Sequence, residues 1–86
     1  MTKAEVAELG AKADILKEAG YYYKFDRKMY INRKEKKAFS IEYIEDHPRS
    51  EIERCISAPA AGAEWHFYFN ADPSPSVRQQ LEYSLG

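Results

Sequence analysis

Cys55, His47 and His66 are the only thiol and imidazole side chains among the 86 residues, so they are the first candidates for metal binding or covalent catalysis. A zinc site or a nucleophile–base pair needs such side chains close together, which a helical or hairpin spacing would provide. None of the three has such a spacing to another. Cys55 lies between Ile52 and Ile56, a setting typical of a buried thiol. We therefore predict no metal site, no cofactor and no catalytic residue.

Acid–base chemistry by His66 with Glu42 or Tyr68 stays open as an alternative, because a sheet could place the three side chains on one face. Nothing in their spacing demands it. The four glycines are isolated from one another, so no glycine-rich phosphate loop is present. We therefore predict a protein that is not an enzyme.

Size and composition indicate one cytoplasmic domain spanning residues 1–86. The single cysteine excludes a disulfide within the chain, whereas small secreted domains usually contain several. The first residues mix acidic and basic side chains, unlike a signal peptide, and no apolar run is long enough to cross a membrane. We expect no membrane partner.

The hydrophobic periodicity predicts the element order α-β-β-β-α-β-α. Thr2 and Glu5 form a capping box and Gly20 is a stop signal for a first helix over residues 3–19. Alternating patterns predict strands over residues 21–25, 29–32, 37–44 and 64–70. A second helix is expected to open at Asp46 and a last helix at Ser74.

This order predicts an α+β fold with a four-stranded, mostly antiparallel sheet and helices packed on one face. The first three strands would form a meander, and the fourth would join after a helical crossover. Up to the second helix the order is similar to that of double-stranded-RNA-binding domains. The chain departs from that family at residues 46–51, which are not basic where the family has a lysine-rich helix start.

The alternation of side chains within each predicted strand separates two faces of the sheet. One face is strongly apolar and is expected to form the core with the helices: Tyr21, Tyr23, Phe25, Met29, Ile31, Phe39, Ile41, Tyr43, Trp65, Phe67 and Phe69. The opposite face is expected to be open and amphipathic: Tyr22, Lys24, Tyr30, Asn32, Ser40, Glu42, His66 and Tyr68. Tyrosine is enriched in interfaces, so this open face is a candidate dimer surface or shallow ligand site, although it could also be merely solvated.

The whole-chain charge of −1 hides a strong asymmetry. Residues 24–37 hold seven bases and two acids, a net +5, whereas residues 38–64 hold six acids and two bases, a net −4. The basic side chains of this predicted hairpin alternate with aromatic residues, which suits phosphate contacts and base stacking. The candidate nucleic-acid contacts are Lys24, Arg27, Lys28, Arg33, Lys34, Lys36 and Lys37.

These patterns favour a non-enzymatic binding module that forms a homodimer through the open sheet face or an exposed strand edge, or binds another protein. The first alternative is a nucleic-acid-binding domain that uses the basic hairpin. A second alternative is a small-molecule site lined by Tyr22, Tyr30, His66 and Tyr68.

Overall fold

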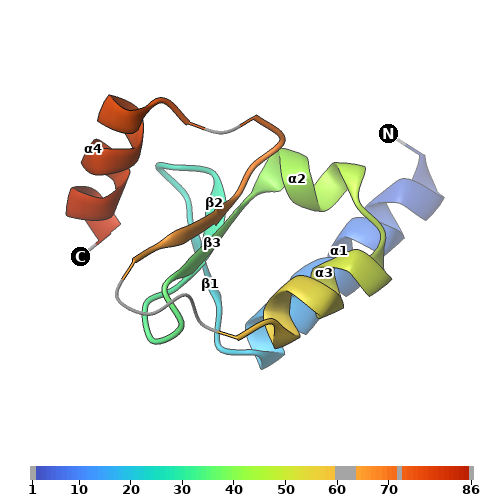
Figure 1. The fold of residues 1–86 in the computed structure, drawn as a ribbon. Helices are drawn as coiled ribbons and strands as arrows, with labels where there is room; N and C mark the ends of the chain where they lie inside the picture. Colours follow the sequence, from blue (N-terminus) through green and yellow to red (C-terminus); the bar gives the residue numbers. More distant parts are fainter. Residues whose placement is uncertain (1, 60–63, 72, 86) are drawn as a thin grey trace.

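A four-stranded sheet lies between two layers of helices (Figure 1). The computed structural model describes residues 2–59, 64–71 and 73–85. The elements are α1 (Lys3–Glu18), β1 (Tyr22–Lys24), β2 (Met29–Asn32), β3 (Lys37–Ser40), α2 (Ile41–Asp46), α3 (Arg49–Ser57), β4 (His66–Tyr68) and α4 (Pro75–Leu85). None of the helices in these ranges is long and apolar enough to cross a membrane.

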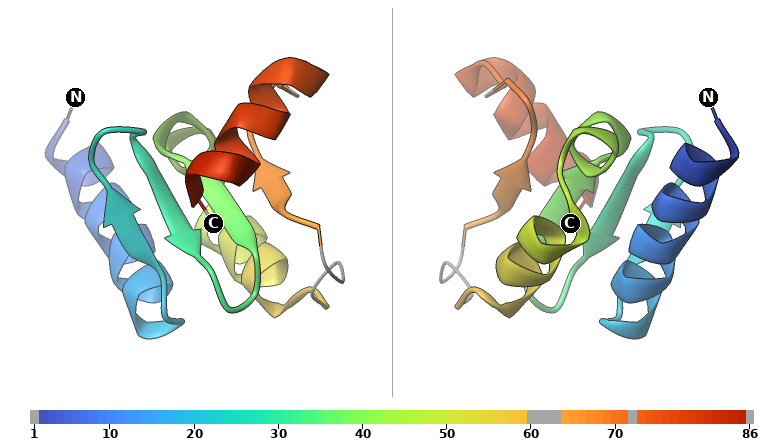
Figure 2. Two further views of the ribbon diagram at one scale, coloured as in Figure 1. Left: turned by 90° about the vertical axis from the view of Figure 1, so that its left-hand side faces the viewer. Right: turned by 90° about the vertical axis from the view of Figure 1, so that its right-hand side faces the viewer.

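The strands lie in the order β1-β2-β3-β4, with β1, β2 and β3 forming an antiparallel meander. After α2 and α3, the chain returns to add β4 parallel to β3. The α+β class, the element order and the mostly antiparallel sheet are therefore confirmed. β1 and β4 are the two edge strands (Figure 2).

The local signals at both ends of α1 act as the sequence predicts. The Thr2 side chain accepts a hydrogen bond from the Glu5 N–H at 3.2 Å and caps the helix. Gly20 has φ of +95°, a left-handed conformation that a residue with a Cβ rarely adopts. Leu16 is fully buried on the inner side of the helix.

The third strand ends earlier than its alternation predicts. Ser40 accepts a hydrogen bond from the Tyr43 N–H at 3.1 Å and caps α2, so residues 41–44 are helical rather than extended. Glu42 is consequently on a helix and not on the sheet. Pro48 then separates α2 from α3, giving two short helices where one was expected.

The prediction that all helices pack on one face is wrong, because each face of the sheet carries its own core. On one face Tyr21, Tyr30 and Phe39 pack with residues of α1, α2 and α3. On the other face Ile31 and Phe67 pack with residues of α4. Figure 1 shows α4 across the sheet from α1 and α3.

The lengths of the two hairpin turns explain why residues predicted to share one face of the sheet lie on opposite faces. In both hairpins four residues separate the last paired positions, Lys24 with Met29 and Asn32 with Lys37. An even turn sets odd-numbered residues opposite even-numbered ones, so Tyr23 shares a face with Tyr30 and not with Met29 or Ile31. Sequence alternation within a strand cannot reveal this relation between strands.

Candidate functional site

The side chains of the predicted open face do not come together. Tyr22, Lys24 and Ser40 lie on the face covered in part by α4, as their pairing with Ile31 and Met29 requires. Tyr30, Asn32, His66 and Tyr68 lie on the opposite face. Tyr30 is only 8% exposed and belongs to the core. Neither a dimer surface nor a small-molecule site can therefore form from this set as one face.

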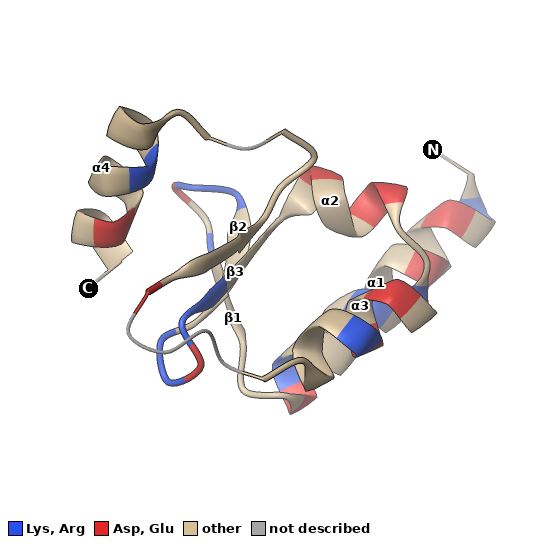
Figure 3. Cartoon of the chain, in the orientation of Figure 1, with Lys and Arg blue, Asp and Glu red and all other residues tan. Residues whose placement is uncertain are grey.

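The basic hairpin is also divided. Arg27 and Lys28 are in the turn between β1 and β2, whereas Arg33 and Lys34 are in the turn between β2 and β3, at the other end of the sheet (Figure 3). Lys36 and Lys24 lie at these same two ends, partly covered. Acidic side chains are concentrated on α1, α2 and α3, so the charge asymmetry of the sequence is also a separation in space.

Lys37 is 1% exposed and does not contribute to a basic surface. Its Nζ donates hydrogen bonds to Cys55 O at 3.1 Å, Ile56 O at 3.0 Å and Ala58 O at 2.6 Å. An ammonium group at the carboxyl end of a helix satisfies carbonyls that lack a partner and complements the helix dipole. No local pattern in the sequence distinguishes this inward-pointing lysine from the other bases of the run.

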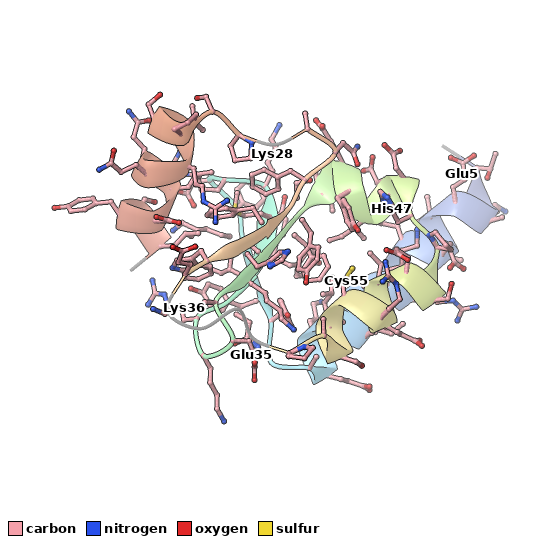
Figure 4. All side chains as sticks on the ribbon, in the orientation of Figure 1. Glu5, Lys28, Glu35, Lys36, His47 and Cys55 are labelled. Carbon is pink, nitrogen blue, oxygen red and sulfur yellow. The ribbon has the colours of Figure 1, made fainter. Side chains whose placement is uncertain are left out.

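Cys55 is buried, as expected (Figure 4), and it contacts the titratable side chains of Tyr43 and Glu51. Its Sγ is 3.6 Å from the Tyr43 hydroxyl and donates a long hydrogen bond of 3.9 Å to Glu51. Burial, followed by the hydrogen bond with Cys55, raises the pKa of Tyr43. The hydrogen bond from Arg54 lowers the pKa of Glu51. These shifts favour a protonated Tyr43 hydroxyl and an ionised Glu51 carboxylate.

Stacked rings extend this group to the surface. The His47 ring stacks on Tyr43 with centroids 3.8 Å apart, and His66 stacks on Tyr68 with centroids 4.7 Å apart. The His47 Nδ1 is 2.8 Å from Tyr43 O. No three His, Cys, Asp or Glu side chains within the described ranges are grouped to hold a metal ion. The Tyr43 hydroxyl of α2 contacts Cys55 Sγ of α3, and the Tyr68 hydroxyl of β4 donates to Cys55 O at 3.5 Å, so these contacts join α2 and α3 to the sheet.

A cleft of about 390 Å³ opens between α1 and α2. Its walls carry Glu5, Glu8, Glu45 and Asp46, and Lys12 reaches its floor. The buried Nζ of Lys12 already has a hydrogen-bond acceptor within the fold, because it donates to Ile44 O at 2.8 Å. This ammonium group partly balances the carboxylates and ties α1 to α2.

Edge strand β1 and the residue that follows it carry three exposed aromatic side chains. The exposed fraction is 43% for Tyr22 and 37% for Tyr23. It is 84% for Phe25, which is the residue just after the strand. The Tyr23 and Phe25 rings meet edge to face at 6.0 Å. Tyr23 and Phe25 were expected in the core, so their exposure corrects the sequence-based assignment. We call Tyr22, Tyr23 and Phe25 the β1 aromatic surface; at this edge Tyr22 lies on the α4 side of the sheet, and Tyr23 lies on the other side in contact with Phe25.

The main chain of Tyr23 faces away from the sheet. The Ile41 N–H donates to Lys28 O at 3.1 Å, so the even-numbered residues of β2 bond with β3 and the odd-numbered ones with β1. Met29 and Ile31 therefore bond with Lys24 and Tyr22. Tyr23, between these two, directs its N–H and C=O to the open edge.

The opposite edge, β4, is better protected. The His66 N–H donates to Lys36 O at 2.8 Å, which turns the main chain of Phe67 outward. Arg78 of α4, however, donates to Trp65 O at 2.8 Å and lies over the Phe67 ring, 5.4 Å from its centroid. A charged side chain that covers an edge discourages pairing with another strand. β1 is therefore the more available edge.

Comparison of the chain with protein-family models, curated proteins and solved structures finds no match.

Proposed function

We propose that this chain is a non-enzymatic interaction module of the cytoplasm that works as a homodimer, with the β1 aromatic surface at the contact. The observation that carries the proposal is the combination of three exposed aromatic side chains with an edge strand whose central residue, Tyr23, has its main chain directed outward. Aromatic residues provide much of the binding energy in protein interfaces.

A second copy is the favoured partner because closed two-fold pairing is the commonest way in which a chain covers its own exposed surface. An exposed strand edge in a small protein otherwise invites uncontrolled association. β1 is only three residues long, which limits the contact that it can make. We therefore expect a modest affinity, in the micromolar range.

The test is the molar mass in solution of the wild type and of Phe25→Glu, measured by light scattering at micromolar concentration. Phe25 is 84% exposed, so the substitution leaves the fold intact and introduces charge into the contact. The matched control is Tyr83→Glu, which changes a 92% exposed aromatic residue on α4. We expect a dimer for wild type and control, and a monomer for Phe25→Glu. Equal masses for the two variants would contradict the proposed surface.

Nucleic acid is the alternative partner of this end of the molecule. Arg27 and Lys28 are exposed in the turn that follows β1, next to Phe25, and a strand-end surface of this kind offers both charge and stacking. Against it, Lys37 is withdrawn into the fold and Tyr30 is buried. This alternative therefore has fewer candidate contacts with nucleic acid than the sequence of the basic hairpin predicts.

A further inference from the structure

We infer that the two copies join β1 to β1 in an antiparallel register centred on Tyr23, so that two four-stranded sheets become one continuous sheet. This inference rests on the proposed homodimer and specifies its geometry. The outward N–H and C=O of Tyr23 in one copy would bond with the C=O and N–H of Tyr23 in the other, as in a regular hydrogen-bonded antiparallel pair.

The side chains of β1 are complementary in this register. Tyr22 of one copy lies opposite Lys24 of the other, and this happens twice because the contact is symmetric. The Lys24 side chain is 23% exposed and its Nζ lies 3.6 Å from Asp26 Oδ1 in the same copy. In this register it would lie beside the Tyr22 ring of the other copy, where an ammonium group is attracted to the aromatic face. Any register shifted by one residue would set unlike faces of the two sheets together.

The hairpin turn provides a second complementary contact. The turn that contains Arg27 follows β1, and the carboxyl end of α1 with Glu18 precedes it, so in the centred register the turn of one copy would lie toward this helix end of the other. The carboxyl end of a helix carries partial negative charge, which adds to that of the Glu18 side chain. Arg27 and Lys28 of each turn would therefore approach the Glu18 end of α1 in the other copy, once at each end of the contact.

The outer side of α1 has room for the second copy. Glu8 forms an ion pair with Arg49 of α3, so this side of α1 faces α3. Gly10, two residues on, is about 200° away around the helix and faces away from α3. A Cβ added at Gly10 would meet no heavy atom within 4 Å. Val6, on the same side of the helix, is 55% exposed.

A glycine inside a helix costs stability relative to alanine, and the packing of one copy gives no reason for it here. A two-fold axis at Tyr23 would bring α1 of the two copies together, since α1 runs alongside β1 on one face of the sheet (Figure 2). Gly10 then allows the two helices to approach closely, and the exposed Val6 side chain gains a partner.

Disulfide formation tests the register directly. In Tyr23→Cys the two introduced Cα atoms would be about 5.5 Å apart, within the range of about 4.4–6.8 Å for a disulfide. In Phe25→Cys they would be about 13 Å apart along the strands. We expect mild oxidation to cross-link Tyr23→Cys and not Phe25→Cys, although Phe25 is the more exposed of the two. The wild type, whose Cys55 is buried, is the background control.

Gly10→Leu is the second test, because it separates folding from pairing. Leucine favours the helix, so the melting temperature of the monomer should rise by about 4–8 °C. The same side chain would separate the two copies of α1, and we expect the dimer dissociation constant to rise at least tenfold. Gly10→Leu with unchanged dimerisation would overturn the predicted contact between the helices.

The outcomes distinguish the register from the proposed function. A wild type with the mass of one chain would reject both. A wild-type dimer in which Phe25→Cys cross-links, or in which Tyr23→Cys does not, would reject the Tyr23-centred register and leave the homodimer in place.

Discussion

The Nζ of Lys37 donates a hydrogen bond to the main-chain oxygen of Ala58 at 2.6 Å, and this joins strand β3 to the end of α3. The same ammonium group also bonds with the carbonyls of Cys55 and Ile56. The crossover that positions β4 is thus held by a buried charge from the neighbouring strand. A residue expected to contact nucleic acid is instead part of the fold.

Lys37→Met should destabilise the protein by about 2–3 kcal/mol, because it leaves three carbonyl oxygens without their charged donor in a buried position. Methionine retains most of the apolar stem, so the loss reports on the ammonium group. Urea unfolding measures it. Lys34→Met, at an exposed position of the same basic run, should change stability by less than about 0.5 kcal/mol. Similar losses for both would show that the hydrogen bonds of Lys37 contribute little.

Signals contained within a few neighbouring residues were readable from the sequence. Thr2 with Glu5 marks the start of α1, and Gly20 marks its end. Relations between distant segments were not readable. The pairing of Tyr23 with Tyr30 depends on how the chain turns between them, and the contact of Lys37 with Ala58 depends on where the crossover ends. For the same reason, the candidate contact surface lies at the β1 edge of the sheet and not on the predicted open face.

Trp65→Ala should cost about 3–5 kcal/mol, because a large buried ring would leave a cavity. Trp65 is 4% exposed and packs in the core between the sheet and α4, where its ring lies parallel to Phe67. Tyr83→Ala on α4 is the control and should be nearly neutral. Thermal or urea unfolding compares the two. A Trp65→Ala loss as small as that of the control would mean that α4 does not hold this core together.

Tyr21→Phe should stabilise the protein by about 1 kcal/mol. Within the described ranges the buried Tyr21 hydroxyl has no hydrogen-bond partner, and removing an unsatisfied polar group recovers its desolvation cost. The substitution retains the edge-to-face contact of the ring with Phe39 at 5.5 Å. A clear loss of stability on urea unfolding would indicate that the hydroxyl is bonded in solution.

Alkaline pH should destabilise the wild type more than Tyr21→Phe. Burial raises the pKa of Tyr21 above its ordinary value of 10.0, so the unfolded chain loses this proton first. The unfolded state then binds fewer protons, and the free energy of unfolding falls as pH rises above about 10, by at most about 1.4 kcal/mol per pH unit for one tyrosine. Parallel pH profiles of the two proteins between pH 9 and 11 would contradict the burial of this hydroxyl.

We expect no measurable binding of single- or double-stranded RNA or DNA at low salt. The exposed bases are divided between two ends of the sheet, and the helix layer beside them is acidic. Fluorescence anisotropy with mixed-sequence probes is the measurement. Binding that weakens steeply with salt and is lost in Arg27→Glu with Lys28→Glu would instead establish the nucleic-acid alternative.

The mass of the wild-type protein in solution tests the central claim most directly. Sedimentation over a concentration series from below to above the micromolar range should show a reversible change from the 10.0 kDa of one chain to twice that value. This change should vanish in Phe25→Glu and persist in Tyr83→Glu. A wild type that stays at 10.0 kDa throughout would contradict the homodimer, and the β1 aromatic surface would then need a different partner.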